Sequence, residues 1–217
     1  MTMQILSADG RPIDAPKGND RNSGYARNKN DWYVEPPWTV ADLLDAEKFS
    51  GGIWDPSCGR GTVPIVAGKR GYASYGSDLV DRGFGLTNTD FFEVHRGMAA
   101  NIVCNPPFNV IERWIQHALQ LTTGKVAIFG TLRMLEGVGR AKLFRATPLA
   151  RVWVCSDRVP CPPGEQAPAI EAWERGTISG TFVPYAWFVW QHGHVGDWTG
   201  GFLPLPRDRV QGELLTP

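Results

Sequence analysis

The sequence has no long hydrophobic run. Within its 217 residues, no apolar stretch approaches the ~20 residues that a membrane-spanning helix requires. The first residues, Met1 to Ile5, also lack the basic-then-apolar order of a secretory signal. We therefore expect a cytoplasmic protein with no membrane partner. The length suits one α/β domain with a sizeable core.

Cysteine is scarce. None of the four cysteines belongs to a Cys-x-x-Cys pair, so we expect reduced, packed thiols and neither a disulfide framework nor a zinc site. His192 and His194 have no further ligands at a usable spacing, and we predict no metal site. The four thiols belong to Cys58, Cys104, Cys155 and Cys161.

The sequence also lacks an excess of either charge, because 22 basic residues face 22 acidic ones. A neutral chain argues against strong, sequence-blind binding of nucleic acid, since such binding depends on neutralising phosphates. Six of the basic residues nevertheless fall between positions 133 and 158, with two acidic residues among them. This cluster is either a surface that guides a polyanion or an ordinary solvated face.

Strand-like and helix-like segments alternate along the chain. This alternation predicts a single α/β domain with a doubly wound, mostly parallel sheet that is covered by helices on both faces. The apolar patterns place helices at 39 to about 49, 61–66, 111–119 and 135–146. They place strands at 53–55, 72–76, 101–104, 125–129, 151–155 and 185–190.

Two stretches fall outside this alternation. Residues 1–30 are rich in Gly, Asn, Asp and Pro and show no period, so we predict a flexible N-terminal segment ahead of a domain at 31–217. Residues 160–181 are rich in Pro and Gly and are too long for an ordinary connection. Loops of that length are usually functional or disordered.

The most informative stretch is Asn105-Pro106-Pro107-Phe108, which directly follows the predicted strand 101–104. Two consecutive prolines cannot continue a sheet ladder, because neither has an N–H to donate and both fix φ. The residue before a proline is restricted to extended backbone, so Asn105 is held at the strand tip. We therefore expect one amide, a rigid corner and one aromatic ring at the carboxyl edge of the sheet, where open α/β folds bind ligands.

A second motif, Asp55-Pro-Ser57-Cys-Gly59-Arg-Gly61-Thr, lies where the first strand turns into a helix. The two glycines allow a ligand to approach the backbone, and the helix start offers free N–H groups. A dinucleotide fingerprint would need a third glycine, which is missing here. The leading carboxylate of Asp55 would repel a pyrophosphate but suits a cationic ligand with an ammonium group.

Further acids follow at regular intervals. Asp78 ends the second predicted strand, where a carboxylate can accept hydrogen bonds from ribose hydroxyls or can cap a helix. Asp90 and Phe91 follow in Thr-Asp-Phe-Phe, either as a ligand contact or as a simple turn. Ahead of the first strand, Tyr33 lies in the aromatic and proline-rich segment 31–38, which either lines a site or covers an apolar edge.

In this order, the motifs resemble those of the S-adenosylmethionine-dependent amino-methyltransferases. Asn-Pro-Pro-Phe resembles the catalytic tetrad of the small, phage-type DNA adenine-N6 enzymes, and Asp-Pro-x-x-Gly-x-Gly-Thr resembles their motif I. The order resembles the gamma class. The family's seven-stranded, Rossmann-like sheet implies that Asp55, Asp78, Asp90 and Asn105 lie at the tips of strands one to four.

The resemblance implies a role for each matched residue. The Asn105 side-chain oxygen and the Pro106 carbonyl would accept hydrogen bonds from the target amino group, with Pro107 completing the tetrad and Phe108 stacking on the base. S-adenosylmethionine would be the cofactor. The residues matched to its binding site are Tyr33, Asp55, Ser57, Gly59, Gly61, Asp78, Asp90 and Phe91.

The implied substrate is adenine in DNA, and the target base would have to leave the duplex to react. Residues 160–181 are then a possible target-recognition insert within the catalytic domain. Two alternatives remain open on the sequence alone. The first is an amino-methyltransferase of the same fold that acts on RNA or on a protein glutamine. The second is a protein that binds the cofactor without catalysis.

Overall fold

The structure is a computed structural model that describes residues 31–174 and 183–204. The predicted flexible segment 1–30 and positions 175–181 of the predicted insert lie outside the described residues. No helix within the described ranges is long and apolar enough to cross a lipid bilayer. The α-helices are α1 (Pro37–Ala46), α2 (Thr62–Lys69), α3 (Ile111–Leu121) and α4 (Val138–Ala146).

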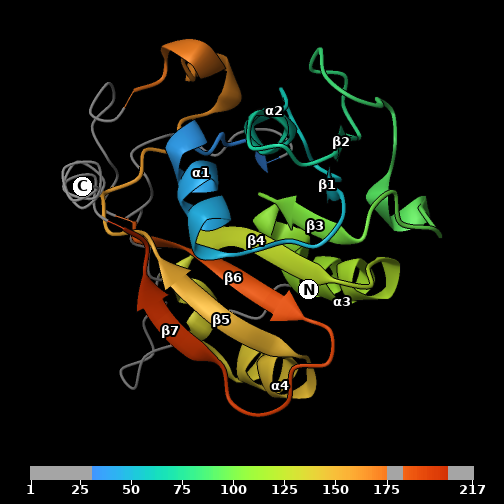
Figure 1. The fold of residues 1–217 in the computed structure, drawn as a ribbon, viewed down its shortest axis with the longest axis vertical. Coiled ribbons are helices and arrows are strands. Elements are labelled where there is room, and N and C mark those ends of the chain that lie inside the picture. The colour runs from blue at the N-terminus through green and yellow to red at the C-terminus, as the bar shows by residue number, and fades with distance from the viewer. Residues whose placement is uncertain (1–30, 175–182, 205–217) are drawn as a thin grey trace, which may run out of the picture.

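The centre of the fold is a seven-stranded sheet with the order β2-β1-β3-β4-β6-β5-β7 (Figure 1). β6 pairs antiparallel with both of its neighbours, and every other pair of described strands is parallel. The predicted mostly parallel, seven-stranded α/β sheet is therefore confirmed. The strands are β1 (Ile53–Asp55), β2 (Ser74–Gly76), β3 (Asn101–Cys104), β4 (Lys125–Thr131), β5 (Leu149–Val154), β6 (Tyr185–Gln191) and β7 (Thr199–Phe202).

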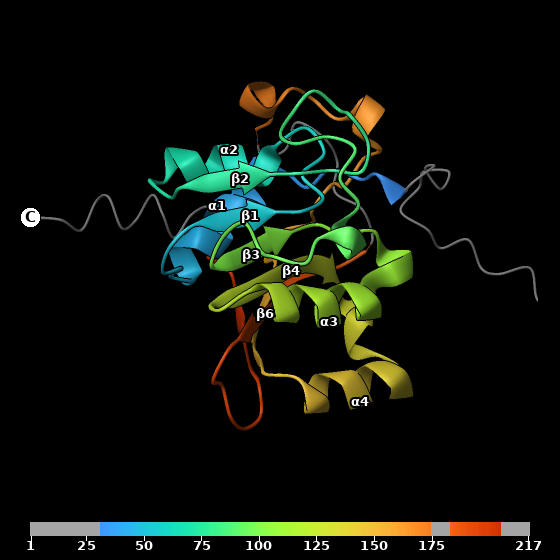
Figure 2. The ribbon, with the colours of Figure 1, turned by 90° about the vertical axis from the view of Figure 1, so that its right-hand side faces the viewer.

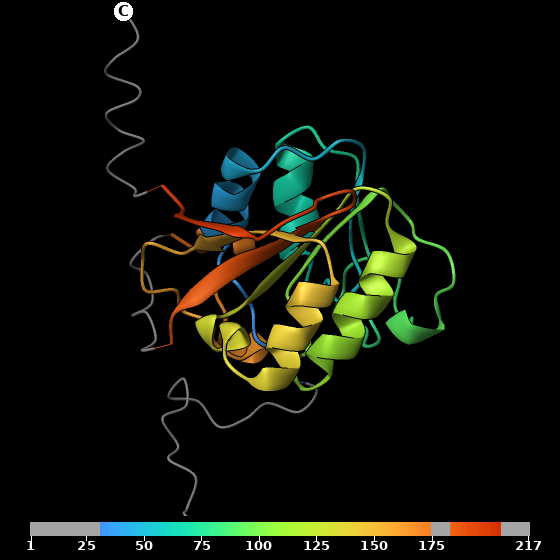
Figure 3. The same ribbon diagram turned by 90° about the horizontal axis from the view of Figure 1, so that it is seen from below.

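Helices cover both faces of the sheet, as the alternation of elements predicts. Seen from below, α1 and α2 lie on one side of the strands, and α3 and α4 lie on the other (Figure 3). The central strand β4 serves both layers, because alternate side chains point to opposite faces. Val126 and Ile128 belong to the core under α3 and α4. Ala127 and Phe129 belong to the core under α1 and α2.

The third strand expected before Asp90 does not form, so that prediction is wrong. Residues between β2 and Asp90 make only an isolated bridge from Ser77 to Leu86. Gly83 and Gly85 have φ angles of 83° and 72°, which interrupt an extended backbone. Asp90 instead caps the short 3-10 helix η2 (Phe91–Glu93).

The sheet nevertheless has seven strands because β7, which the sequence patterns do not predict, adds an edge beside β5. Its sequence, Thr-Gly-Gly-Phe, has no alternation of apolar and polar side chains. The pairing requires a close approach at Gly201, where an added Cβ would lie 2.6 Å from the Trp153 ring. The strand thus depends on a tertiary contact that local propensity does not show.

The remaining described elements are short 3-10 helices at strand ends and in the long loop. Figure 2 shows that the loop after β5 and the loop after β2 extend beyond the same side of the sheet. These loops bring distant parts of the chain together above the carboxyl ends of β1, β2 and β3. The 3-10 helices are η2, given above, η3 (Phe108–Val110), η4 (Leu132–Leu135), η5 (Gly164–Gln166) and η6 (Ile170–Ala172).

Candidate active site

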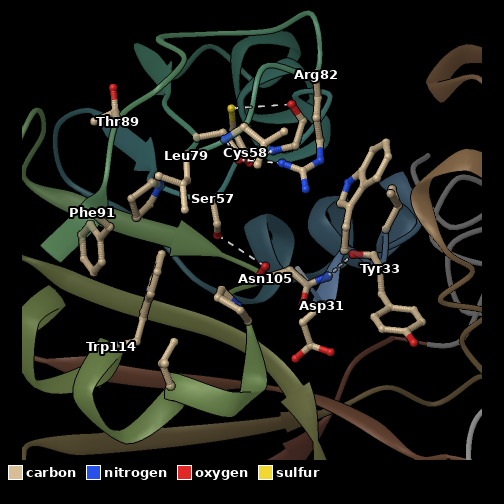
Figure 4. A pocket seen from close by; sticks show the side chains of 18 of the residues that line it. Asp31, Tyr33, Ser57, Cys58, Leu79, Arg82, Thr89, Phe91, Asn105 and Trp114 are labelled. Atoms are coloured by element: carbon tan, nitrogen blue, oxygen red, sulfur yellow. Dashed lines mark hydrogen bonds and ion pairs between the residues drawn. The ribbon is translucent and has the colours of Figure 1, made fainter. Parts of the chain in front are cut away.

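A cavity of about 790 Å³ opens at the carboxyl ends of β1, β2 and β3 (Figure 4). That volume is in the range of small-molecule and cofactor sites. Its walls come from four segments, at 31–35, 56–62, 78–92 and 105–114. Eight predicted site residues line it, namely Tyr33, Ser57, Gly59, Asp78, Asp90, Phe91, Asn105 and Pro107. Asp55, Gly61, Pro106 and Phe108 are not part of the lining.

The Asn105 amide has a single orientation. Its Nδ2 donates to the Tyr33 carbonyl and to the Glu35 carboxylate, both at 2.9 Å. A backbone carbonyl can only accept, so the nitrogen of the amide must be the atom that faces Tyr33. With both Nδ2 hydrogens engaged, Oδ1 is the remaining acceptor of this side chain, which lines the cavity. Figure 4 shows this side chain between Ser57 and the segment that carries Tyr33.

The other tetrad residues lie around this corner. The Pro106 side chain is buried, and Pro107 lies on the cavity wall. The Phe108 backbone N–H donates to the Asp31 carboxylate at 2.9 Å, which ties the corner to the start of the described chain. Phe108 is half-buried outside the cavity lining, so its stacking on a base stays a prediction.

The predicted glycine loop turns tightly between β1 and α2. Gly59 and Gly61 have φ angles of 53° and 89°, which glycine adopts without strain. A Cβ on Gly61 would lie 2.5 Å from the Phe84 ring. The Ser57 hydroxyl donates to the Asn105 carbonyl at 3.3 Å, so the loop and the tetrad are joined directly.

Three buried carboxyl groups lie at or next to the cavity: Glu35 and Asp78 line it, and Asp55 is not part of the lining. Glu35, Asp55 and Asp78 are 6%, 2% and 7% exposed. Burial raises the pKa of Glu35 to about 7, against smaller opposing effects that include its hydrogen bond with Asn105. Burial and then the Glu35 charge raise the pKa of Asp55 well above its ordinary value. A cationic group in the cavity would relieve this repulsion.

Asp78 organises the loop that follows β2. Its Oδ1 accepts from the Val80 N–H at 2.8 Å and from Arg82 at 2.7 Å, and its Oδ2 accepts from the Gly59 N–H at 2.8 Å. No helix begins at this position, so Asp78 is not a helix cap. The Arg82 guanidinium lies 4.4 Å from the centre of the Trp32 ring. A ribose contact at Asp78 stays a prediction.

Asp90 and Phe91 form the far wall. Asp90 Oδ1 accepts from the Phe92 N–H at 2.9 Å, which fixes the start of η2. Phe91 is only 2% exposed, and its ring centre lies 4.1 Å from that of Trp114. Most of the Phe91 ring therefore belongs to the core, and one part of it reaches the cavity.

The described part of the 160–181 loop packs against the aromatic segment. Val34 N–H donates to the Pro162 carbonyl at 3.1 Å, and Gly164 N–H donates to the Trp32 carbonyl at 3.2 Å. Arg60, from the glycine loop, donates to the Ala167 carbonyl at 3.1 Å. Positions 159–174 carry three acidic residues and no basic one. This stretch therefore has no cation to offer a phosphate.

The basic cluster at 133–158 is divided between two places. Arg140 donates to the Arg133 carbonyl at 2.8 Å, so these two residues lie together near η4. Arg151 instead forms an ion pair with Glu47, near the amino ends of β4 and β5. The cluster is not one continuous surface.

Glu35, Trp32 and Arg82 are among the cavity residues that motif matching did not single out. Glu35 lies among Val34, Pro36 and other apolar residues, and that placement was the available signal. A carboxylate inside an apolar stretch must be paired or must serve a purpose when it is buried. Arg82 had no such signal, because it falls in a loop.

Comparisons with known proteins add similarities of fold. No protein-family model matches the sequence, and no curated protein matches it significantly. Among solved structures, it is similar to protein 1320 of Thermoplasma acidophilum (TM-score 0.48, 15% identity, 71% of this chain and 86% of that chain). The chain is also similar to magnesium protoporphyrin IX methyltransferase from Synechocystis PCC 6803 with bound S-adenosylhomocysteine (TM-score 0.47, 14% identity, 71% of this chain and 80% of that chain). A third similar structure is that of a putative RNA methyltransferase from Pyrococcus horikoshii (TM-score 0.47, 11% identity, 71% of this chain and 80% of that chain).

Proposed function

We propose that this chain is an enzyme that transfers a methyl group from S-adenosylmethionine to the N6 amino group of adenine in DNA. The observation that carries the proposal is the held Asn105 amide, whose two donors are bound by Tyr33 and Glu35 at 2.9 Å. This arrangement leaves an acceptor oxygen on the wall of the cavity. An acceptor at a rigid corner fits an amino group as the reacting partner.

The chemistry of the cavity suits S-adenosylmethionine. The sulfonium and ammonium charges of that molecule would favour the ionised forms of two buried carboxyls, Glu35 and Asp55, because burial raises the pKa of each. The glycine loop exposes its backbone without interference from side chains. Ser57, Gly59 and the 31–35 segment would hold the amino-acid part. Asp78, Asp90 and Phe91 would hold the nucleoside part.

Asn105 would act on the nitrogen that receives the methyl group. An exocyclic amino nitrogen is a poor nucleophile, because its lone pair is delocalised into the ring. Hydrogen bonds accepted by the Asn105 Oδ1 and the Pro106 carbonyl favour a tetrahedral nitrogen with a free lone pair. These bonds strengthen as positive charge develops on nitrogen, so they stabilise the transition state more than the ground state. Phe108 would stack on the extruded base.

Labelled S-adenosylmethionine tests the proposal. The protein is incubated separately with DNA, RNA and a protein mixture, and each product is digested to nucleosides or amino acids. We expect label in N6-methyl-2′-deoxyadenosine from DNA. Label in RNA nucleosides or in N-methylglutamine would replace the proposed substrate with an alternative of the same chemistry. Cofactor binding without transfer to any of the three would refute catalysis.

Asn105→Ala tests the mechanism in the same assay. We expect a fall in transfer rate on the order of 10²-fold or more, as for removal of one transition-state hydrogen bond. Binding of S-adenosylmethionine should persist. Gln120→Ala removes an exposed amide from the far end of α3 and serves as the control. Equal loss of binding and transfer in folded Asn105→Ala would contradict the assigned role.

A further inference from the structure

The two acceptors that hold the Asn105 amide differ in kind. The Tyr33 carbonyl is a neutral backbone group, fixed by the segment 31–35. The Glu35 carboxylate is a titratable side chain, and it accepts from the same nitrogen at the same distance of 2.9 Å. Without Glu35, one Nδ2 hydrogen loses its partner, and the amide gains freedom to rotate out of its present plane.

A negative acceptor also changes the electronic state of the amide. Hydrogen bonds in series polarise one another, and this effect is greater in a site of low dielectric constant. An ionised Glu35 shifts the electron density of the amide away from Nδ2 and toward Oδ1, so that Oδ1 becomes more negative. Oδ1 then accepts more strongly from an amino nitrogen that is becoming positive. A protonated Glu35 gives little of this effect.

We propose that Glu35 is a positioning residue that holds Asn105 with Oδ1 toward the reacting amino group and activates that oxygen through its own negative charge. This inference rests on the proposed methyl transfer at the same site. It adds Glu35, which is not among the residues matched to the family's motifs.

The surroundings of Glu35 link its charge to occupation of the cavity. Glu35 acts electrostatically on Asp55, Arg60, Cys104 and Cys161. Arg60 is the single cation among them and only partly offsets the effect of burial, so the pKa of Glu35 is about 7. A bound cation would lower this pKa and keep the carboxylate ionised while transfer takes place.

Variants at position 35 test the inference by kinetics. Glu35→Gln keeps an acceptor oxygen and the side-chain shape but removes the charge, and Glu35→Ala removes both. We expect the turnover number to fall on the order of tenfold in Glu35→Gln and further in Glu35→Ala, as for partners that orient a functional side chain. The affinity for S-adenosylmethionine should change by less than the turnover number. The acidic limb of the wild-type pH–rate profile should disappear in Glu35→Gln.

Glu47→Gln is the matched control, because it removes a buried glutamate that does not line the cavity. Its turnover number should equal that of the wild type at a temperature where both are folded. An equal loss in the two glutamine variants would overturn the inference, since lost stability would then explain it. A loss confined to cofactor affinity would also overturn it, because Glu35 would then be a cofactor ligand.

A spectroscopic measurement tests the contact without any activity. The protein is labelled with ¹⁵N-asparagine and studied by NMR. The Asn105 side-chain signal is the one that is absent from the spectrum of Asn105→Ala. We expect its two amide protons to move as pH crosses the Glu35 titration, and to stay still in Glu35→Gln. A wild-type signal that is insensitive to pH would refute the contact. If the signal behaves as expected but no substrate is methylated, the proposed function fails and the positioning contact stands.

Discussion

Glu35 should make the ligand-free protein less stable as the pH rises toward neutrality. The group is 6% exposed, and burial raises its pKa from 4.5 to about 7. Between these two values, the unfolded chain has released the proton while the folded protein still holds it. Stability from this group is therefore complete below about pH 4.5, declines through this window and is lost above about pH 7.

The size of the effect follows from the shift. One pKa unit corresponds to about 1.4 kcal/mol, so a rise from 4.5 to about 7 amounts to about 3 kcal/mol of unfolding free energy. This is a large share of the stability of a typical domain, which is about 5–15 kcal/mol. Glu35→Gln cannot ionise and should escape the loss. We therefore expect this variant to become the more stable protein at pH 8.

Urea denaturation at several values between pH 4.5 and pH 8 measures the difference directly. Comparing the wild type with Glu35→Gln cancels the contributions of the titrating groups that do not interact with Glu35; Asp55 is the carboxyl whose pKa depends on the Glu35 charge. The gap between the two unfolding free energies should change by about 3 kcal/mol across this range. If the unfolding free energies of the two proteins change in parallel with pH, the reasoning is refuted. Addition of S-adenosylmethionine should reduce the gap, because the bound cation stabilises the ionised form.

Two further perturbations test other parts of the structure. Glu47 accepts from Lys125, Arg151 and Trp153; burial alone would raise its pKa, but these contacts outweigh burial and hold the pKa below 4.5. Glu47→Gln should lower the free energy of unfolding by about 2 kcal/mol at pH 7. This loss should decline as the pH falls below 4.5, because the wild type then loses the same charge. A loss that is independent of pH in urea denaturation would count against this explanation. At Gly164, an added Cβ would lie 2.1 Å from the Trp32 ring, so Gly164→Ala should lower thermal stability by about 1–3 kcal/mol and weaken S-adenosylmethionine binding in calorimetry. At Gly139, the nearest atom to an added Cβ would be a Glu112 carboxylate oxygen at 3.8 Å, an ordinary contact distance. Gly139→Ala should therefore be neutral or slightly stabilising, and similar losses in both variants would exclude the steric explanation.

The contrast between the two buried glutamates separates structural from functional carboxylates. Glu47 has two cationic partners and lies away from the cavity. Glu35 has an amide partner and a second acid nearby, an arrangement that costs stability unless a cation offsets it. Functional sites often contain such unfavourable groups, because they serve a bound ligand instead of the free fold. The pKa directions of the two residues follow this division.

Much of the fold was predictable from local patterns. The strand at Asn101–Cys104 and the helix that begins at Ile111 have the expected positions, because buried runs and a helical period are strong signals. The prediction of a strand before Asp90 was wrong, because glycines with positive φ interrupt the extended backbone of that segment. β7 was missed, because its two glycines carry no side-chain pattern and its pairing depends on Trp153.

The sequence by itself determined the order of the motifs and the placement of Asn105 at the end of a buried strand. Prolines and strand periodicity act through neighbouring residues, so they can be interpreted without a structure. Only the tertiary structure decided which way the Asn105 amide faces. Its partners, Tyr33 and Glu35, lie about seventy positions earlier in the chain. Contacts between residues so far apart depend on the packing of the sheet, and no local preference encodes them.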